Sequence, residues 1–483
     1  MTEPLWTLDD LVAAAAGTRD DPADTKQNVG GREGHVSGIS IDTRSLASGD
    51  LFVALKDARD GHEFVPTAFA KGAAAALVAD GYRRQPGDGI LIRVDDTLRA
   101  LERIGRAARV RLPRSARVVA VTGSAGKTGT KEMLRSCLQA GGTTPGRVHA
   151  PEKSFNNHWG VPLTLARMPR DTEYAVFEIG MNHANEIRPL TKLVAPHVAV
   201  VTNVLPVHVG NFPDGELGVA QAKAEVFEGL VQPGIAVIPS DSTHFARLAE
   251  AAMRHAETVI TFGAAPESDV RLESVSDLQA NGCQNVVAVT MEPPRRLAFD
   301  MALIGRHLAV NAMAVLATMC ALDLDPGPAL PALAGVQSSQ GRGQRMALEA
   351  GDERILLLDE SYNANPASMA AALANLAATP TQGRRLAVMG DMLELGEDAV
   401  AYHTGLLPGA QRADLVFCCG PAMKHLFAAI PAEKRGAWAP TSAELVAQLV
   451  PNVRSGDTVM VKGSLGSRMA QVVDAIKKRF APA

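Results

Sequence analysis

The sequence predicts an α/β protein of three domains. The chain has 483 residues, which is more than one hydrophobic core usually supports. Short apolar runs rich in β-branched residues alternate with helical patterns along most of it, as in doubly wound α/β folds. Two polar segments containing Pro or Gly, at residues 111–115 and 337–343, interrupt this alternation. We therefore expect domains at residues 1–113, 114–340 and 341–483.

Composition excludes several classes of protein. The net charge of −4 gives no general electrostatic reason to bind nucleic acid. No uninterrupted run of about 18 apolar residues predicts a membrane span, and no signal peptide pattern is visible at the start. The five scattered cysteines form no CxxC pair, so free thiols in a reducing compartment explain them best. We expect a cytoplasmic protein.

The first segment has the pattern of a small α/β unit. Thr7 is the expected N-cap of a first helix, together with Asp10 three residues on. Strand patterns span residues 38–44, 49–55 and 73–78, and a helical pattern spans 65–72. Polar residues gather at the end of the first strand, where α/β folds bind ligands, although a solvated turn is the commoner explanation: Ser40, Asp42, Thr43 and Arg44.

A glycine-rich loop is the strongest functional motif of the sequence. It lies between a buried strand pattern at residues 118–122 and a helical pattern. Glycines let the backbone approach phosphates, and the N–H groups and dipole of a helix start favour an anion. A lysine for the outer phosphates and a hydroxyl for Mg²⁺ complete a nucleotide site. Only two residues separate the glycines, where the general P-loop has four, so a plain turn is the alternative. The loop comprises Gly123, Ser124, Ala125, Gly126, Lys127 and Thr128.

Three further residues of the central segment attract attention. Glu178 ends an apolar strand pattern, and a buried carboxylate needs a partner. Mg²⁺ beside the loop is one such partner, and a salt bridge is the alternative. His208 follows another buried strand, and Lys223 lies in the next helical pattern. Taken alone, His208 is more often a surface or capping residue.

The last segment again alternates strands with helices. Its strand patterns span residues 355–359, 385–390, 415–420 and 458–464. Polar residues and glycines lie at the carboxyl ends of these strands, where doubly wound sheets bind ligands. The segment therefore predicts a second ligand-binding edge, separate in sequence from the glycine loop.

In their order along the chain, these motifs resemble the Mur ligases, the ATP-dependent ligases of peptidoglycan synthesis. The shortened loop is similar to that family's own P-loop. The resemblance also includes Asp42 to Arg44, Gly49 to Phe52, Asp60 to His62, Asn156-Asn157, Phe177 to Gly180, His208, Ala222-Lys223, Gly305 to Asn311, Ser361 to Pro366, Gly390 to Met392 and Val461 to Ser464. One departure is Asp359-Glu360, where most relatives have two aspartates.

Within the family, residues 361–366 and 390–396 are most similar to the members that add D-alanyl-D-alanine. The DNPR-type motif of the diaminopimelate- or lysine-adding members is not found. The resemblance implies an ATP-dependent peptide ligase that joins D-alanyl-D-alanine to UDP-N-acetylmuramoyl-tripeptide through an acyl phosphate. It implies an N-terminal domain for the UDP-sugar, a central P-loop ATPase with a mostly parallel sheet, and a C-terminal Rossmann-like domain for the amine. ATP and two Mg²⁺ ions are the implied cofactors, and the protein is expected to be a monomer.

The resemblance also implies roles at the phosphate end. Lys127 holds the outer phosphates, Thr128 and Glu178 bind one Mg²⁺, and His208 binds a second with the help of Lys223. A lysine cation beside Mg²⁺ is unfavourable, and the family's solution is a carbamylated lysine, here Lys223. These four catalytic candidates are Lys127, Glu178, His208 and Lys223.

Other roles are implied at the two ends of the site. Asn311 contacts the adenine end with His307 one turn before it, and Arg342 or Arg345 reaches the γ-phosphate, Arg345 fitting slightly better. Candidates for the UDP end are Ser40, Asp42, Thr43, Arg44 and His62. The remaining substrate candidates are Asn156 and Asn157, and, on the dipeptide side, Asn363, Asn365, Asp391 and Lys462.

Two alternatives remain at this point. One is another ligase of the same superfamily, such as a folylpolyglutamate synthetase or a different Mur ligase. The other is a P-loop regulator or transporter subunit that hydrolyses ATP without ligation, which the motifs outside the P-loop disfavour.

Overall fold

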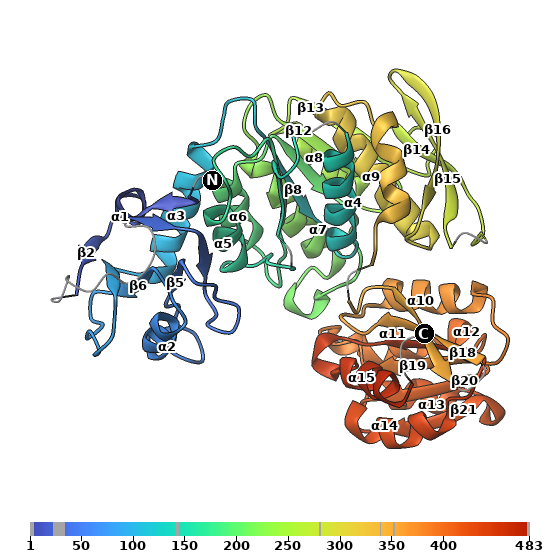
Figure 1. Ribbon diagram of the computed structural model, residues 1–483. Helices are drawn as coiled ribbons and strands as arrows, with labels where there is room; N and C mark the ends of the chain where they lie inside the picture. The colour runs from blue at the N-terminus through green and yellow to red at the C-terminus, as the bar shows by residue number, and fades with distance from the viewer. Residues whose placement is uncertain are drawn as a thin grey trace.

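The computed structural model describes residues 4–22, 34–141, 144–151, 153–279, 282–338, 340–350 and 353–480. Three bodies follow one another along the chain, coloured from blue through green and yellow to red in Figure 1. Their main sheets lie within residues 18–94, 117–301 and 344–462, each inside one of the three predicted segments, and β1 (Trp6–Thr7) and β3 (His35–Val36) form a small two-stranded sheet in the first. Ser339, in the second predicted linker, lies outside the described residues.

The N-terminal body is a small sheet with strand order β2-β7-β6-β5-β4, parallel except for the β2–β7 pair. The Thr7 hydroxyl accepts the N–H of Asp10 at 3.0 Å, so the predicted helix cap is confirmed. The strand predicted at residues 38–44 already ends at Ser40, because the polar residues that follow form a turn. Its elements are β1 (Trp6–Thr7), α1 (Leu8–Ala15), β2 (Thr18–Asp20), β3 (His35–Val36), β4 (Gly38–Ser40), β5 (Asp50–Val53), α2 (Val65–Ala70), β6 (Ala75–Ala79), β7 (Ile90–Val94) and α3 (Thr97–Val110).

The central body is built on a long sheet with strand order β16-β15-β14-β13-β12-β11-β8-β10-β9. Its strands are parallel from β9 to β14, and β15 and β16 extend it as an antiparallel hairpin. Its elements are β8 (Arg117–Thr122), α4 (Lys127–Ala140), β9 (Val148–His149), α5 (Gly160–Ala166), β10 (Tyr174–Glu178), α6 (Ile187–Val194), β11 (Val198–Val201), α7 (Glu216–Ala224), β12 (Ile235–Pro239), α8 (Phe245–Met253), β13 (Thr258–Gly263), β14 (Val270–Val275), β15 (Gln284–Met291), β16 (Pro294–Met301) and α9 (Arg306–Ala321).

The C-terminal body is a sheet with strand order β17-β18-β22-β19-β20-β21, parallel except at β17. Helices cover it in the doubly wound manner that the sequence predicts. Its elements are β17 (Gln344–Ala350), β18 (Glu353–Glu360), α10 (Pro366–Ala378), β19 (Arg385–Gly390), α11 (Ala399–Thr404), α12 (Leu407–Ala410), β20 (Leu415–Cys419), α13 (Met423–Ala429), β21 (Arg435–Ala439), α14 (Ser442–Leu449), β22 (Thr458–Lys462) and α15 (Ala470–Arg479).

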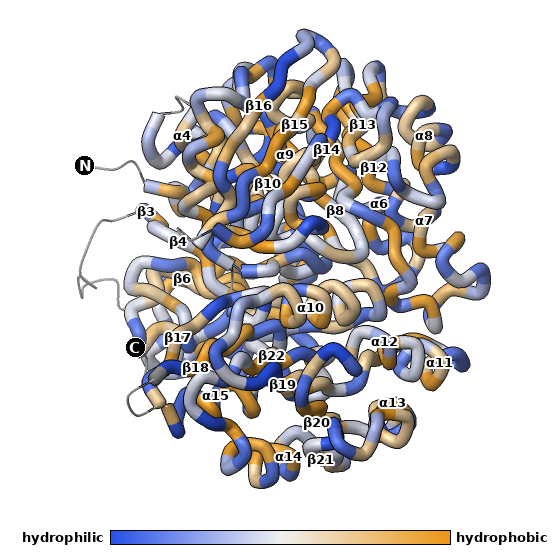
Figure 2. Tube along the Cα trace, turned by 90° about the vertical axis from the view of Figure 1, so that its right-hand side faces the viewer, coloured by the Kyte–Doolittle hydropathy of each residue, from blue (hydrophilic) through white to orange (hydrophobic). Residues whose placement is uncertain are grey.

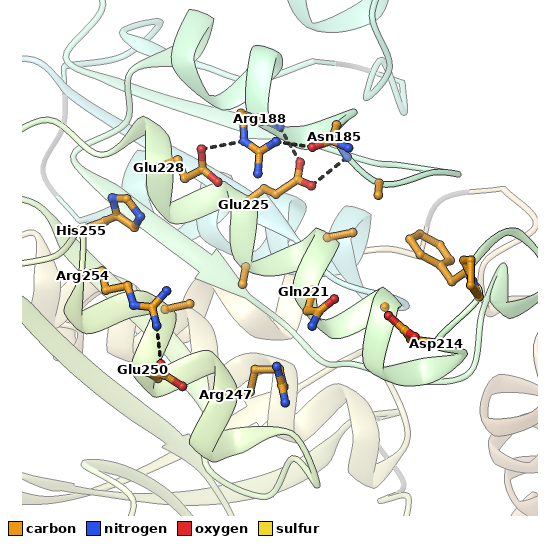
Figure 3. Close-up of a pocket in the computed structure, with 17 residues that line it drawn as sticks. Asn185, Arg188, Asp214, Gln221, Glu225, Glu228, Arg247, Glu250, Arg254 and His255 are labelled. Carbon is orange, nitrogen blue, oxygen red and sulfur yellow. Dashed lines mark hydrogen bonds and ion pairs between the residues drawn. The ribbon is translucent and has the colours of Figure 1, made fainter.

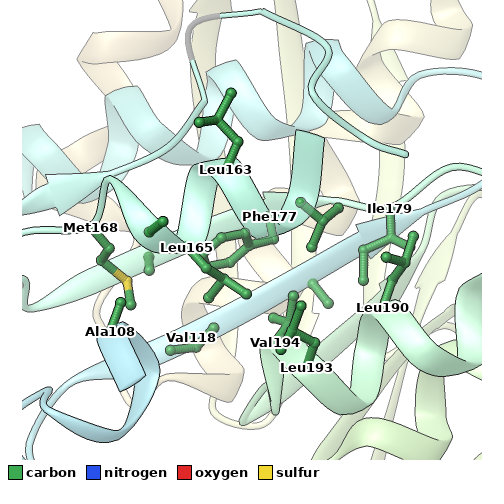
Figure 4. Close-up of a cluster of buried hydrophobic side chains, with 14 of the residues drawn as sticks. Ala108, Val118, Leu163, Leu165, Met168, Phe177, Ile179, Leu190, Leu193 and Val194 are labelled. Carbon is green, nitrogen blue, oxygen red and sulfur yellow. The ribbon is translucent and has the colours of Figure 1, made fainter. Parts of the chain in front are cut away.

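The hydrophobic core joins the first two bodies. One cluster of buried side chains runs from Trp6 and Leu101 to Phe177 and Leu248, because α3 packs against α5 of the central body. Figure 4 shows part of this cluster, where Ala108 lies near Leu165 and Met168. The C-terminal body has clusters of its own on the two faces of its sheet.

Hydrophobic residues follow the strands, and hydrophilic ones follow many of the loops (Figure 2). Among the described residues, no helix is both long enough and apolar enough to cross a membrane. None of the five cysteines, all of which lie among the described residues, forms a disulfide, and Cys418 and Cys419 are buried in β20 as the strand pattern predicts.

Candidate active site

A cleft of about 320 Å³ lies between the central and C-terminal bodies. The central body contributes the glycine loop, the start of α9 and the residues that follow β10. The C-terminal side contributes the residues that precede β17, the loop after β18 and the end of β22. The ends of parallel strands from two sheets thus face one space, as ligand sites in α/β folds do.

The glycine loop, the predicted phosphate-binding loop, lines one side of this cleft. Gly126 has a left-handed backbone (φ 80°) directly before α4 begins at Lys127. A Cβ at Gly126 would lie 2.4 Å from Asn311 Nδ2, so only glycine fits this close approach. The Lys127 Nζ donates to the main-chain oxygen of Gly123 at 2.7 Å and folds over the loop. Its pKa is lowered by burial, which the Glu178 carboxylate partly opposes.

Two predicted metal ligands meet beside the loop. The Thr128 hydroxyl donates to Glu178 Oε2 at 2.8 Å, and both side chains are buried. Asn156 Nδ2 donates to Glu178 Oε1 at 2.7 Å, and the Ser154 hydroxyl lies 3.0 Å from that of Thr128. The hydrogen-bond partners recorded for Glu178 are thus neutral groups and not a lysine or arginine. A buried carboxylate with hydroxyl and amide oxygens nearby is a donor set that fits Mg²⁺.

His208 and Lys223 lie near the same phosphate end. His208 Nδ1 contacts the Glu394 carboxylate of the C-terminal body. Burial lowers the pKa of His208, Glu394 opposes this, and the charges of Lys223 and Lys127 add to it. Lys223 is buried in α7, and its pKa lies well below its usual range because of burial and the charge of Lys127. Imidazole alone is a poor Mg²⁺ ligand, so a second ion here would need oxygen atoms from modified Lys223 or from Glu394.

The structure separates the two candidate arginines. Arg342 lines the cleft, and its Nη2 donates to Ser154 Oγ at 3.2 Å. Its guanidinium lies over the ring of Tyr362, 4.0 Å from the centroid. Arg345 lies in β17 in register with Leu358 and is not among the residues that line the cleft. The geometry therefore favours Arg342, in contrast to the slight preference that the sequence gives to Arg345.

The adenine-side candidates lie at the start of α9. His307 lines the cleft. Asn311 is buried beneath Gly126, so it supports the glycine loop from below. The structure thus places Asn311 next to the backbone of the glycine loop, one helical turn after His307.

The dipeptide-side candidates divide into two groups. Lys462 and Asn363 line the cleft, and the Lys462 Nζ donates to the Asn363 main-chain oxygen at 2.9 Å and lies 3.5 Å from Glu360 Oε2. Asn365 also lines the cleft, but its side chain caps α10 by accepting the N–H of Ser368 at 2.8 Å.

Asp391 is held by the C-terminal fold itself. Its buried carboxylate accepts the N–H groups of Ala422 and Met423 at the start of α13. Asp391 is not among the residues that line the cleft. Asp391 thus stabilises the C-terminal fold, whereas Asn363 and Lys462 line the cleft, although all three lie at or just after the end of a strand.

The remaining candidates show the same division. Asn157 Oδ1 accepts the N–H groups of Trp159 and Gly160 at 3.2 and 2.9 Å, in the turn that leads into α5. His62 uses both ring nitrogens locally: Nδ1 pairs with Asp60 at 2.6 Å, and Nε2 accepts the N–H of Ala79 at 2.9 Å. Both side chains therefore accept main-chain N–H groups of this chain. Their positions in the sequence motifs do not show this structural role.

The polar turn after β4 faces the central body. Asp42 pairs with Arg44 at 2.6 Å, and Ser40 Oγ donates to the Asp42 main-chain oxygen at 2.9 Å. The pKa of Asp42 is lowered mainly by Arg44, with a smaller contribution from Lys153 of the central body. The Thr43 main-chain oxygen accepts Lys71 Nζ at 2.8 Å. Ser40 is buried, Asp42 and Thr43 are half-buried, and Arg44 is the exposed member of the four candidates.

Sequence reasoning missed three residues of the cleft region. Ser154 lies two residues before the Asn156-Asn157 motif and is not part of it, and only its contacts with Thr128 and Arg342 reveal it. Tyr362 and Glu394 lie inside segments that resemble the family, but only neighbouring residues of those segments were predicted as site residues. A signal for Glu394 was present, since it is a carboxylate in a loop after a parallel strand.

A second cavity, of about 490 Å³, borders α7 through Gly218, Gln221 and Ala222 (Figure 3). Its charged residues largely pair with one another: Arg188 with Glu228 at 2.7 Å, and Arg254 with Glu250. The first cleft differs because its charged groups converge from two bodies on the glycine loop. We therefore assign the candidate active site to the first cleft.

Comparison with known proteins agrees with this geometry. The Mur ligase middle domain matches residues 121–319, and the Mur ligase glutamate ligase domain matches residues 341–465. The UDP-N-acetylmuramoyl-tripeptide–D-alanyl-D-alanine ligase of Escherichia coli (strain K12) is 35% identical over 448 residues, which cover 91% of this chain and 93% of that protein. The ligase of the same name from Bacillus subtilis (strain 168) is 32% identical over 451 residues, covering 91% and 92%. A crystal structure of MurF from Acinetobacter baumannii matches with a TM-score of 0.81 at 28% identity, covering 99% of both chains.

Proposed function

This chain belongs to the Mur ligase family, and from that premise we infer that it catalyses the reaction named for its relatives. It joins D-alanyl-D-alanine to UDP-N-acetylmuramoyl-tripeptide with ATP, in the synthesis of peptidoglycan precursors. The products are ADP, phosphate and UDP-N-acetylmuramoyl-pentapeptide. Similarity to these ligases over more than nine-tenths of the chain supports this reaction over hydrolysis of ATP alone.

The proposal rests mainly on one observation: charged and polar residues of the central body and of the C-terminal body face the same cleft. Lys127, Thr128 and Glu178 come from the central body, and Arg342 and Lys462 come from the C-terminal side. A ligase of this kind must hold a triphosphate and an incoming amine on two sides of one carboxylate. A plain ATPase does not need the second set.

The chemistry follows from the inertness of a carboxylate toward an amine. An oxygen of the tripeptide carboxylate attacks the γ-phosphorus, the bond to ADP breaks, and an acyl phosphate forms. The amine nitrogen of the dipeptide then attacks the acyl carbon, and phosphate leaves as the peptide bond forms. Such phosphoryl transfer depends mainly on positioning and on neutralisation of charge.

The residues of the cleft supply these two effects. Lys127 and the N–H groups at the start of α4 hold the outer phosphates, and Arg342 adds a positive charge from the C-terminal side. Thr128 and Glu178 would hold Mg²⁺, which when bound would neutralise phosphate charge. Asn156 and Ser154 fix the orientation of Glu178 and Thr128.

Lys223 is proposed to be carbamylated. Its surroundings favour a neutral amine, because the side chain is buried near the charge of Lys127. A neutral amine can add CO₂, with loss of one proton, and the product carries an anionic oxygen group. That group would join His208 as a ligand of a second Mg²⁺, for which oxygen ligands are needed.

We also propose which residues bind the substrates at the two ends of the site. The turn with Ser40, Asp42, Thr43 and Arg44 is assigned to the UDP end, and Asn363 and Lys462 are assigned to the dipeptide. We propose that residues 1–113, 114–340 and 341–483 serve the UDP-sugar, ATP and the amine respectively, in a cytoplasmic monomer.

The proposal is tested by an assay of ADP release with UDP-N-acetylmuramoyl-tripeptide and ATP. The acceptors are D-alanyl-D-alanine, single D- and L-amino acids, diaminopimelate, or none. We expect rapid release and a pentapeptide product by mass spectrometry only with the dipeptide. Equal release without any acceptor would refute ligation, and a preference for a single amino acid would point to another ligase of the family.

A further inference from the structure

Lys131 is a buried lysine that none of the roles above uses. It lies in α4, four residues after Lys127, and its side chain is 0% exposed. A fully buried ammonium group is unfavourable unless its N–H groups meet acceptors. The Lys131 Nζ donates to the main-chain oxygen of Pro151 at 2.5 Å and lies 2.6 Å from Glu132 Oε1.

Pro151 lies near the start of the β9–α5 loop, which we define by its described residues 150, 151 and 153–159. This loop carries two side chains of the candidate metal site. Ser154 Oγ lies 3.0 Å from Thr128 Oγ1, and Asn156 Nδ2 donates to Glu178 Oε1 at 2.7 Å. Ser154 Oγ also accepts Arg342 Nη2 at 3.2 Å, so the loop meets the C-terminal side of the cleft.

The end of this loop that leads into α5 is held by two sets of hydrogen bonds. The Asn156 main-chain oxygen accepts the N–H of Gly180 at 2.8 Å, and Asn157 Oδ1 accepts the N–H of Gly160, the first residue of α5, at 2.9 Å. At the other end, the bond from Lys131 ties Pro151 to the helix that follows the glycine loop. Ser154 and Asn156 are only half-buried, so packing alone does not fix them.

We propose that Lys131 is a positioning residue for the ATP-dependent step. Its ammonium group fixes Pro151 to α4 and so aims Ser154 and Asn156 at Thr128 and Glu178. Thr128 and Lys131 belong to the same helix, so the glycine loop and the β9–α5 loop are held in one frame. The inference rests on the proposed function, because it assigns Lys131 a part in that reaction.

The main variant is Lys131→Met, which keeps an unbranched apolar side chain, one heavy atom shorter, and removes the N–H donors. The matched control is Arg135→Met, one turn further along α4. Arg135 also pairs with Glu132, at 2.8 Å, and no contact between it and the β9–α5 loop is recorded among the described residues. The measurements are kcat, the KM for MgATP and the KM for D-alanyl-D-alanine, with thermal unfolding to check the fold.

We expect Lys131→Met to lower kcat by about 10- to 100-fold, as small misplacements of catalytic groups do. The KM for D-alanyl-D-alanine should stay within about twofold of the wild type, because the dipeptide candidates lie on the other side of the cleft. Arg135→Met should stay within about twofold for every constant. A folded Lys131→Met protein with wild-type kcat, or an equal loss in Arg135→Met, overturns the proposal.

A double-mutant cycle tests whether Lys131 acts through the loop. If it does, Lys131→Met should cost little further activity in a Ser154→Ala background, because groups that act as one unit are not additive. Losses that multiply in the double variant overturn the proposal. Ser154→Ala with wild-type kcat also overturns it, whatever the folding of the Lys131 variants. The wild-type protein is assayed first: if it makes no pentapeptide, the proposed function fails, whereas these variants test only the inference about Lys131.

Discussion

Replacing Arg342 by alanine tests how the two bodies share the phosphate end of the cleft. Arg342 lines the cleft, contacts Ser154 at 3.2 Å and lies over Tyr362. Arg345 lies in β17 and does not line the cleft. We expect Arg342→Ala to remove a positive charge that the transferring phosphoryl group needs, and Arg345→Ala to leave that charge in place.

The size of the effect follows from Coulomb's law. Two unit charges about 4 Å apart interact by about 4 kcal/mol at an effective dielectric constant of about 20. Because about 1.4 kcal/mol corresponds to a tenfold change in rate, the upper limit is about a thousandfold. Arg342 is only half-buried, so solvent screens part of this interaction. We therefore expect kcat/KM for ATP to fall about a hundredfold in Arg342→Ala and less than about threefold in Arg345→Ala.

The assay is ADP release with all three substrates, with thermal unfolding of each variant as the control for folding. Arg342→Lys is a useful third variant. It keeps the charge and loses the planar fork, so we expect an intermediate loss. The assignment of Arg342 to the phosphate end is wrong if kcat/KM for ATP in Arg342→Ala stays within about threefold of the wild type. It is also wrong if Arg345→Ala lowers kcat/KM more than Arg342→Ala does.

Three further predictions concern other residues. Lys127→Ala should lower kcat by about a thousandfold or more while the thermal midpoint hardly changes; near-normal turnover would contradict its phosphate role. Lys223→Ala should lose most activity and regain part of it with short carboxylic acids, which can replace a carbamate; neither defect nor rescue would reject the modification. Burial lowers the pKa of His149 to about 4, and its Nε2 lies 2.8 Å from the Thr164 oxygen. The unfolded pKa is about 6.5, so His149 contributes stability that is full above pH 6.5 and is lost as pH falls toward 4. His149→Gln should flatten the fall of unfolding free energy in that window by at most about 1.4 kcal/mol per pH unit, and an unchanged slope in urea melts would contradict this.

The fold class could be predicted because its signals are local. The apolar strand pattern at residues 118–122 became β8, and the apolar pattern that includes Glu178 became β10, which ends at that residue. The glycine loop between β8 and α4 has the left-handed Gly126 that its pattern requires. The carboxylate at the end of β10 is buried beside Thr128, as the strand pattern implied. In each case, the residue and the partner that explains it lie in one motif or in neighbouring strands.

The residues whose roles the sequence could not resolve depend on distant backbone. Asp391 accepts N–H groups of Ala422 and Met423, and His62 accepts that of Ala79. In the sequence, a carboxylate or imidazole that accepts a main-chain N–H group cannot be distinguished from one that binds a ligand. The choice between Arg342 and Arg345 likewise depended on where β17 begins, at Gln344, because only the residue before that strand reaches the cleft. Boundaries of this kind are the least certain part of any sequence pattern.

The measurement that tests the central claim most directly follows an oxygen atom. UDP-N-acetylmuramoyl-tripeptide labelled with ¹⁸O in its reacting carboxylate is incubated with ATP, Mg²⁺ and D-alanyl-D-alanine, and the released phosphate is analysed by mass spectrometry. If the carboxylate attacks the γ-phosphorus, each phosphate released with a new peptide bond carries one oxygen from the carboxylate. Pentapeptide accompanied by unlabelled phosphate would contradict the acyl phosphate and the arrangement of the cleft that we derive from it.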